Sequence, residues 1–254
     1  MKERIISAII MCIICLPFLI IGGTLFKIGV GILSFIALKE VFNLKKEKKF
    51  PIPVLLTSLV MLLLIEFLPL NIKVICATFL VMFMLSVVFF EENKFTTNEA
   101  FTLSTFIIFL GLVFNYLIKL YLNEPLYFLL IVMFCVFTDI FAYVTGMNIG
   151  KHKVTKISPK KSLEGFIGGL VMGTIIASTY YMIFIGYAPI YKVILGILLL
   201  SFSCEMGDLF YSAVKRQAHI KDFSNLIPGH GGLLDRIDSL TIVTIVYIII
   251  EGLI

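Results

Sequence analysis

Long apolar stretches recur along the whole 254-residue chain, and short polar segments separate them. A membrane-spanning helix needs about 20 mainly apolar residues, because each residue adds about 1.5 Å along the helix axis. The pattern predicts spans at residues 5–22, 24–43, 51–70, 73–91, 100–120, 125–146, 165–187, 189–207 and 239–254. We therefore predict an all-α, polytopic integral membrane protein with about nine transmembrane helices.

The lysine and arginine residues concentrate in the loops on one side of this predicted bundle, for example at residues 44–49 and 151–161. Short loops rich in basic residues remain in the cytoplasm. This rule predicts a cytoplasmic N-terminus and an external C-terminus in the cell membrane. It also places the polar loops 147–164 and 208–238 together in the cytoplasm, where they can meet.

The two halves of the chain differ in polar content. Residues 1–124 are predicted to be a transmembrane scaffold of about five helices, and residues 125–254 a catalytic transmembrane region that carries both polar loops. Glu66 and Asp139 lie inside apolar spans, where a carboxylate is costly unless it is paired or lines a wet cavity. Their roles stay open. Small residues at close spacing predict tight helix packing at Gly165, Gly168, Gly169 and Gly173.

Composition excludes several classes of function. The chain is 60% hydrophobic with a net charge of +5, and the bias of basic residues toward cytoplasmic loops explains that charge. We predict no nucleic-acid partner. The five cysteines are scattered through apolar spans without the histidines or second cysteine pair of a zinc site, so they are interpreted as small buried hydrophobes.

Acidic residues flank a polar segment that lies between two apolar stretches. Asp208 precedes this segment, and Asp235 and Asp238 end it. Magnesium prefers oxygen ligands and usually binds through one or two carboxylates plus substrate phosphates. Asp235 and Asp238 share a helix face if their segment is helical. Capping of the last helix by these acids is an alternative that the sequence leaves open.

The same segment contains glycines and basic residues suited to anions. Gly229, Gly231 and Gly232 allow positive φ and let backbone N–H groups approach a phosphate. His230 is a candidate for phosphate binding or proton transfer, although a hydrogen bond within the turn explains it equally well. The positive charge that a triphosphate and a second phosphate require is supplied by Lys215, Arg216, Lys221 and Arg236.

The order of these residues carries a family resemblance. The run Ser212-x-x-Lys215-Arg216-x-x-x-x-Lys221-Asp222-Phe223-x-x-Leu226-x-Pro228-Gly229-His230-Gly231-Gly232-x-x-Asp235-Arg236-x-Asp238 closely resembles the signature of the phosphatidate cytidylyltransferases, or CDP-diacylglycerol synthases. Asp139, Tyr143, Gly146 and the segment 158–165 are also similar to that family. Ser224 stands where the signature commonly has a glycine.

The resemblance implies transfer of CMP from CTP to phosphatidic acid, with release of pyrophosphate, in phospholipid synthesis. It also implies dependence on Mg²⁺, with K⁺ as a further ion that shares the site. By resemblance and residue type, the catalytic candidates are Asp208, Asp235, Lys215, Arg216, His230 and Arg236, and the metal ligands are Asp208, Asp235 and Asp238. The substrate-binding candidates are Ser158, Lys160, Lys161, Glu164, Ser212, Lys221, Asp222, Gly229, Gly231 and Gly232. Lys160 and Lys161 are expected to face phosphate, with Glu164 orienting one of them.

Other functions remain in competition with this one. A related CTP-using transferase would act on another lipid phosphate or a polyprenol. A carrier or flippase for an anionic lipid would spread charges through the bundle, whereas this chain concentrates them at one face, and no internal repeat of the transporter type is evident. A homodimer is common among integral enzymes, and no residue pattern selects or excludes one here.

Overall fold

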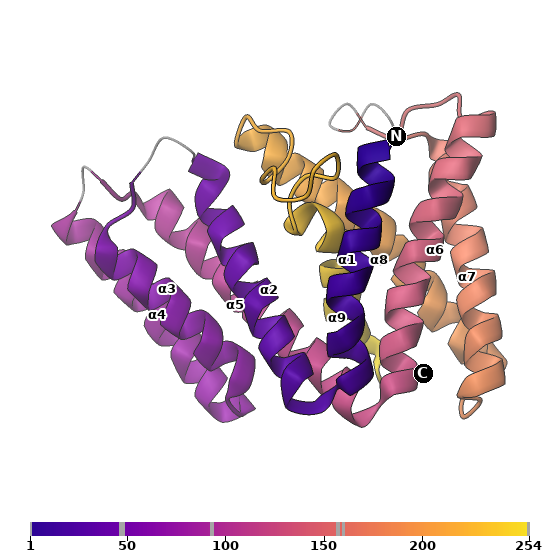
Figure 1. Cartoon of the computed structure of the whole chain (residues 1–254), viewed down its shortest axis with the longest axis horizontal. Coiled ribbons are helices and arrows are strands. Elements are labelled where there is room, and N and C mark those ends of the chain that lie inside the picture. Colours follow the sequence, from indigo (N-terminus) through magenta and orange to yellow (C-terminus); the bar gives the residue numbers. More distant parts are fainter. Residues whose placement is uncertain (1, 46–48, 92–93, 156–157, 159–160, 253–254) are drawn as a thin grey trace. The chain divides into compact units, whose positions relative to one another are not determined.

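The fold is built from helices whose limits follow the apolar stretches closely (Figure 1). The structure is a computed structural model that describes residues 2–45, 49–91, 94–155, 158 and 161–252, with the backbone alone at 2–6, 8–9 and 12. Within these residues there is no β-strand. The helices are α1 (Lys2–Ile21), α2 (Gly23–Phe42), η1 (Asn43–Lys45), α3 (Ile52–Phe67), α4 (Leu70–Phe90), α5 (Thr97–Asn123), α6 (Pro125–Ile149), α7 (Leu163–Phe184), α8 (Ile190–Gln217) and α9 (Leu234–Ile250).

The prediction of an all-α fold is confirmed for the described residues, and each predicted span overlaps one α-helix. The predicted loop 208–238 is shorter in the structure, because α8 continues to Gln217 and α9 begins at Leu234. Within the described residues, the five helices α4 to α8 are long and apolar enough to cross a membrane. The chain is therefore a multi-pass membrane protein. The total of nine crossings and the sidedness of the two termini stay predictions.

Proline and serine residues set several of the helix starts. Pro69 and Pro189 are the N-caps of α4 and α8, and α6 begins at Pro125. Proline suits these positions because its missing N–H would have no partner in the first turn of a helix. Ser162 caps α7, since its Oγ accepts a hydrogen bond of 3.1 Å from the Gly165 N–H.

Two compact units make up the chain. The first contains Met1–Ile118 and Asp222–Asp235, and the second contains Lys119–Lys221 and Arg236–Ile254. The segment Asp222–Asp235 thus packs with the N-terminal helices, although the sequence-based division assigns it to the second half. That division concerns which half carries catalysis, and it stays a prediction.

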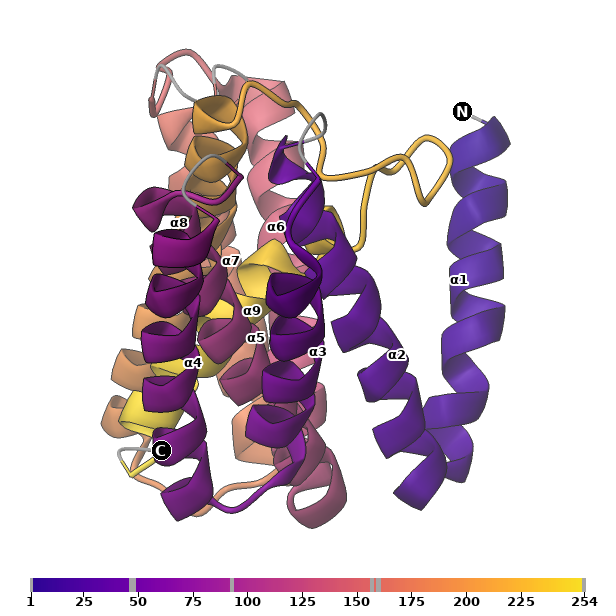
Figure 2. The same ribbon diagram turned by 90° about the vertical axis from the view of Figure 1, so that its left-hand side faces the viewer.

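The first unit is a set of helices packed in chain order, with α1 beside α2, α2 beside α3 and α3 beside α4 (Figure 2). Gly111 of α5 faces α3, where a Cβ atom would lie 2.7 Å from a methyl carbon of Ile65. Ile65 and Leu62 are fully buried at this contact. Close approach through a glycine and burial of branched side chains hold α3 and α5 together.

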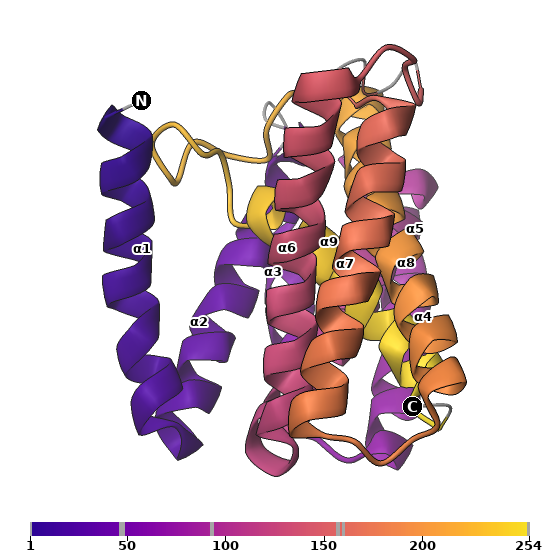
Figure 3. The same cartoon turned by 90° about the vertical axis from the view of Figure 1, so that its right-hand side faces the viewer.

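In the second unit, α6, α7 and α8 lie side by side (Figure 3). The predicted glycine packing is confirmed here, because α7 presents Gly165, Gly169 and Gly173 to α6. A Cβ atom at Gly165 would lie 2.7 Å from the carbonyl oxygen of Ala142, and one at Gly169 would lie 2.9 Å from that of Thr138. These backbone atoms cannot rotate away, so the small residues fix the distance between the two helices.

We expect Gly165→Ala to destabilise the second unit by about 1–3 kcal/mol, because the new methyl group forces α6 and α7 apart. The measurement is thermal unfolding of the purified protein in detergent. Gly252→Ala is the matched control, since a Cβ atom there meets no other atom within 4 Å. Equal midpoints for the two variants would contradict the packing argument.

Candidate active site

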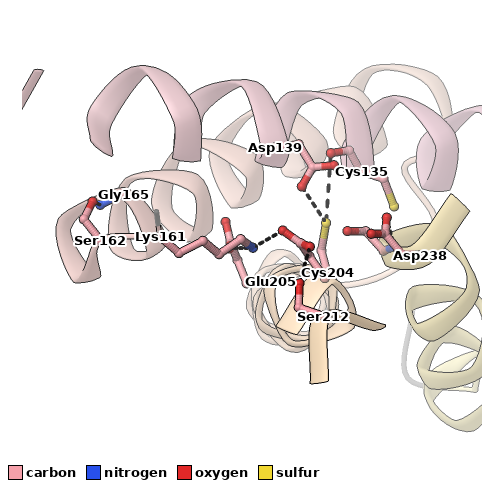
Figure 4. A network of polar contacts seen from close by, with 11 residues as sticks. Cys135, Asp139, Lys161, Ser162, Gly165, Cys204, Glu205, Ser212 and Asp238 are labelled. Carbon is pink, nitrogen blue, oxygen red and sulfur yellow. Dashed lines mark hydrogen bonds and ion pairs between the residues drawn. The ribbon is translucent and has the colours of Figure 1, made fainter. Parts of the chain in front are cut away.

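Four carboxylates from three helices gather in the second unit. They are Asp139 of α6, Glu205 and Asp208 of α8, and Asp238 of α9, and we call them the carboxylate cluster. Asp139 interacts electrostatically with each of the other three. Figure 4 shows Asp139, Glu205 and Asp238 arranged around the side chain of Cys204. Like charges in an apolar scaffold repel one another strongly, so the cluster requires positive charge nearby.

Lys161 supplies positive charge to the cluster. Its Nζ lies 2.8 Å from an oxygen of Glu205 and 2.8 Å from an oxygen of Asp208. The side chain of Glu205 is 1% exposed and that of Lys161 is 19% exposed, so this ion pair is largely shielded from solvent. Burial alone would lower the pKa of the Lys161 ammonium, but the attraction of Glu205 and Asp208 outweighs it and raises that pKa. Lys161 is therefore charged at neutral pH.

The spacing along α8 explains why its polar side chains meet at one place. Glu205, Asp208 and Ser212 are three and four residues apart, which places them on one helix face. Ser212 Oγ donates to Asp208 Oδ1 over 3.4 Å. Gly207 faces α9, where a Cβ atom would lie 3.0 Å from the Cα of Ser239. This close approach brings Asp238 toward α8.

The cluster fits a divalent cation that keeps part of its water. Glu205 Oε1 is buried and has no hydrogen-bond partner among the described residues, and such an atom is costly unless something binds it. In the described part of the chain, no three His, Cys, Asp or Glu side chains are arranged to hold a metal ion unaided. Magnesium needs only one or two protein carboxylates when substrate phosphates and water complete its shell.

Asp235 belongs to the first unit, where it organises the loop before α9. Its Oδ2 accepts hydrogen bonds of 2.9 Å from the backbone N–H groups of Phe223 and Gly232. The residue is buried. Asp235 thus shapes residues 222–235, here called the signature segment, from within. Both donors precede α9, so neither bond is a cap of the first turn of that helix. Its predicted role as a metal ligand beside Asp208 stays a prediction.

Two of the three glycines in the glycine-rich turn use positive φ, and Gly232 does not. Gly229 and Gly231 have φ of 74° and 89°, a region that favours glycine. The N–H groups of His230 and Gly231 donate to the Ile227 carbonyl. His230 Nδ1 lies 2.8 Å from Ser7 Oγ of α1, and Figure 2 shows this loop reaching α1. A phosphate that binds these N–H groups would have to compete with the internal acceptor.

The remaining candidates lie in varied surroundings. Lys215 is buried, whereas Arg216, Lys221 and Arg236 are exposed. Arg216 Nη1 donates to the Ile220 carbonyl. Asp222 lies in the first unit, where its Cβ would be 3.5 Å from a Cβ built at Gly231.

The loop before α7 also contains candidates. The Glu164 carboxylate accepts hydrogen bonds from the N–H groups of Lys151 and His152, and its Oε1 lies 2.6 Å from His152 Nδ1. Glu164 therefore ties the two ends of this loop together. The Ser158 N–H donates to Thr155 Oγ1. Lys160 lies outside the described residues. The substrate-binding roles of these residues stay predictions.

Sequence reasoning did not select two carboxylates, Glu205 and Glu40, that make important polar contacts in the structure. Glu205 pairs with Lys161, and Glu40 of α2 binds the loop that precedes α9. The sequence feature that could have identified them is the one that drew attention to Asp139, a carboxylate in apolar surroundings. Each is an acidic residue within or next to a long apolar stretch, where burial demands a partner.

Comparison with known proteins shows the family of the chain. The family model described as "Cytidylyltransferase family" matches residues 2–253. A phosphatidate cytidylyltransferase of Staphylococcus saprophyticus is 35% identical over 251 residues, which cover 94% of each chain. Phosphatidate cytidylyltransferases of Bacillus subtilis and Staphylococcus aureus are each 34% identical, over 94% of this chain and 93% and 94% of their own lengths. The chain belongs to the cytidylyltransferase family.

We expect Lys161→Met to lower the free energy of unfolding by about 3 kcal/mol, because it leaves Glu205 as an uncompensated buried charge. Thermal unfolding in detergent measures this change. The double variant Lys161→Met/Glu205→Gln should recover most of the loss, because it removes that charge.

Lys45→Met is the matched control for this loss. Lys45 also pairs with a buried carboxylate, that of Glu99, but its side chain is 55% exposed and Glu99 keeps a hydrogen bond from the Thr96 N–H. Its loss should therefore cost less. A loss for Lys161→Met no larger than that for Lys45→Met would contradict the assigned role.

Proposed function

We propose that this protein is a phosphatidate cytidylyltransferase, which transfers CMP from CTP to phosphatidic acid and releases pyrophosphate. Family membership and relatives of that name, matched over 94% of this chain, support the assignment. The observation that carries it is the pairing of Lys161 with Asp208 and Glu205 within the carboxylate cluster. A charged site of this kind on apolar helices suits a reaction between a soluble triphosphate and a lipid phosphate.

The chemistry requires one bond to form and one to break. An oxygen of the lipid phosphate attacks the α-phosphorus of CTP, the bond from that phosphorus to the bridging oxygen breaks, and pyrophosphate leaves with the electron pair. A phosphate monoester is already largely ionised at neutral pH, since its second pKa is about 6. A strong general base is therefore unnecessary, and positioning plus electrostatic stabilisation carry the reaction.

Basic side chains have the role of neutralising the two reacting anions. We assign this role to Lys215, Arg216, Lys221 and Arg236, together with Lys160 and Lys161 from the preceding loop. Charged hydrogen bonds from such groups strengthen as the phosphates lose water. Ser158, Ser212 and the glycine-rich turn would contact the substrates, and His230 would bind phosphate or carry a proton.

Mg²⁺ is the proposed cofactor, and K⁺ is the proposed second ion. Asp208, Asp235 and Asp238 would hold the magnesium, which supplies Lewis-acid stabilisation of the phosphates when it is bound. We place this site at the cytoplasmic face of the cell membrane, where CTP is available and where the basic loops are predicted to lie. The acyl chains of phosphatidic acid would remain among the apolar helices. A homodimer is compatible with this arrangement.

The purified protein in detergent should convert CTP and phosphatidic acid to CDP-diacylglycerol when Mg²⁺ is added. Radiolabelled CTP followed by separation of the lipid fraction measures the product. Incubation with EDTA in place of Mg²⁺ is the control and should give no labelled lipid. Absence of labelled lipid across phosphatidic acids of several chain lengths would reject the assignment, whereas label on another lipid phosphate would indicate the related transferase.

Asp208→Asn should lower kcat by at least roughly 100-fold, because it removes a charge that the proposed metal requires. Glu124→Gln is the control, since Glu124 is an exposed acid at the N-terminus of α6 and should retain parental activity. Size-exclusion chromatography should give the same elution volume for both variants. Activity of Asp208→Asn within a few-fold of the parent would remove Asp208 from the metal site. Asp235→Asn should also abolish turnover, but it disturbs loop hydrogen bonds as well.

A further inference from the structure

Glu40 lies near the end of α2 and binds the signature segment, residues 222–235, which belongs to the same compact unit. Its Oε1 accepts hydrogen bonds of 2.6 Å from Ser224 Oγ and 2.8 Å from the Leu233 N–H. Its Oε2 accepts one of 2.8 Å from the Leu234 N–H. The residue is 2% exposed. A buried carboxylate with three donors to two oxygens is strongly held in one orientation.

The segment is shaped to admit this carboxylate. A Cβ atom at Gly232 would lie 2.5–2.8 Å from the carboxylate atoms of Glu40, so any larger residue would displace it. Leu234 is the first residue of α9, and the first N–H groups of a helix have no partner within the helix. Glu40 supplies that partner from a helix that is 194 positions away in sequence.

Two carboxylates thus divide the backbone donors of this segment between them. Asp235 accepts from Phe223 and Gly232, and Glu40 accepts from Leu233 and Leu234. The three consecutive N–H groups at residues 232–234 are all bound by these acids. Removal of Glu40 would leave two of the donors without their acceptor in a largely buried place, which costs more than the loss of an exposed hydrogen bond.

We propose that Glu40 is a positioning residue for the transfer reaction, which fixes the start of α9 and so orients Asp235. This inference rests on the proposed function, in which Asp235 is a ligand of the magnesium ion. Glu40 acts through the backbone at residues 233 and 234 and does not itself contact CTP or the lipid phosphate. The N-terminal helices therefore contribute to catalysis through α2.

Glu99 provides a useful contrast within the same unit. It is also buried, and its partners include Lys45 and the N–H of Thr96, just before its own helix. Those contacts stabilise the fold without touching the signature segment. A comparison of Glu40 with Glu99 therefore separates the positioning of the segment from the general cost of changing a buried acid.

Glu40→Gln in the full-length protein is the decisive variant, because it preserves side-chain shape but places an NH₂ group against a backbone or hydroxyl donor. We expect kcat/KM to fall roughly tenfold. The Mg²⁺ concentration for half-maximal activity should rise several-fold, because Asp235 is no longer held in place. Hydrogen exchange of a peptide covering residues 233 and 234, measured without substrate or metal, should become faster. Glu40→Ala should show larger changes in the same directions.

Two control variants and the assay of the parent make the test complete. Glu99→Gln should leave both the Mg²⁺ dependence and the exchange at residues 233 and 234 unchanged. Ser224→Ala removes only the hydroxyl donor, so its kcat/KM should fall less than threefold, at the weak end of single hydrogen-bond effects. Unchanged exchange and unchanged Mg²⁺ dependence in Glu40→Gln would overturn the inference. An inactive parent protein would instead reject the proposed function, and the exchange measurement would still test the hold of Glu40 on the segment.

Discussion

A carboxylate buried among apolar helices needs a partner, and this constraint organises both compact units. In the second unit the partner of Glu205 is the Lys161 ammonium, which Asp208 also binds. In the first unit the partners of Glu40 are backbone N–H groups at the start of α9. An unpaired charge at either place would cost several kcal/mol, which is a large part of the stability of a typical domain. Each acid therefore fixes the position of a segment that is distant in sequence.

Glycine residues make these pairings possible. Glu205 approaches α7 at Gly169, and Glu40 approaches the signature segment at Gly232, in each case at a distance that a Cβ atom would block. Gly207 permits the same closeness between α8 and α9. In an apolar environment helices gain little from hydrophobic contact with one another, so close packing and polar bonds hold them together. The glycines and the charged residues thus form one structural system.

Apolar length was sufficient to predict the helices, because prolines or polar residues separate the long hydrophobic runs and also mark the helix limits, as Pro125 and Pro189 do at the starts of α6 and α8. The signature residues could be recognised from the sequence because they all lie within one short stretch, residues 212–238. The pairings could not be predicted, since Glu40 and Leu234 are 194 positions apart and hydropathy carries no information on which acid faces which donor. Likewise, the sequence led to the prediction that Lys161 faces phosphate, which stays a prediction, but it did not predict that Lys161 bridges Glu205 and Asp208.

The electrostatics of the carboxylate cluster bear on why the proposed reaction would use a metal. CTP and phosphatidic acid are both polyanions, and a site that contains Asp139, Glu205, Asp208 and Asp238 repels them unless cations intervene. Lys161 alone offsets only part of this negative charge. Divalent cations offset more of it while binding phosphate oxygens directly, and their carboxylate ligands then become attractive instead of repulsive to the substrates. The carboxylates would thus attract the metal ion to the site, and the bound metal ion would attract the phosphates of the nucleotide.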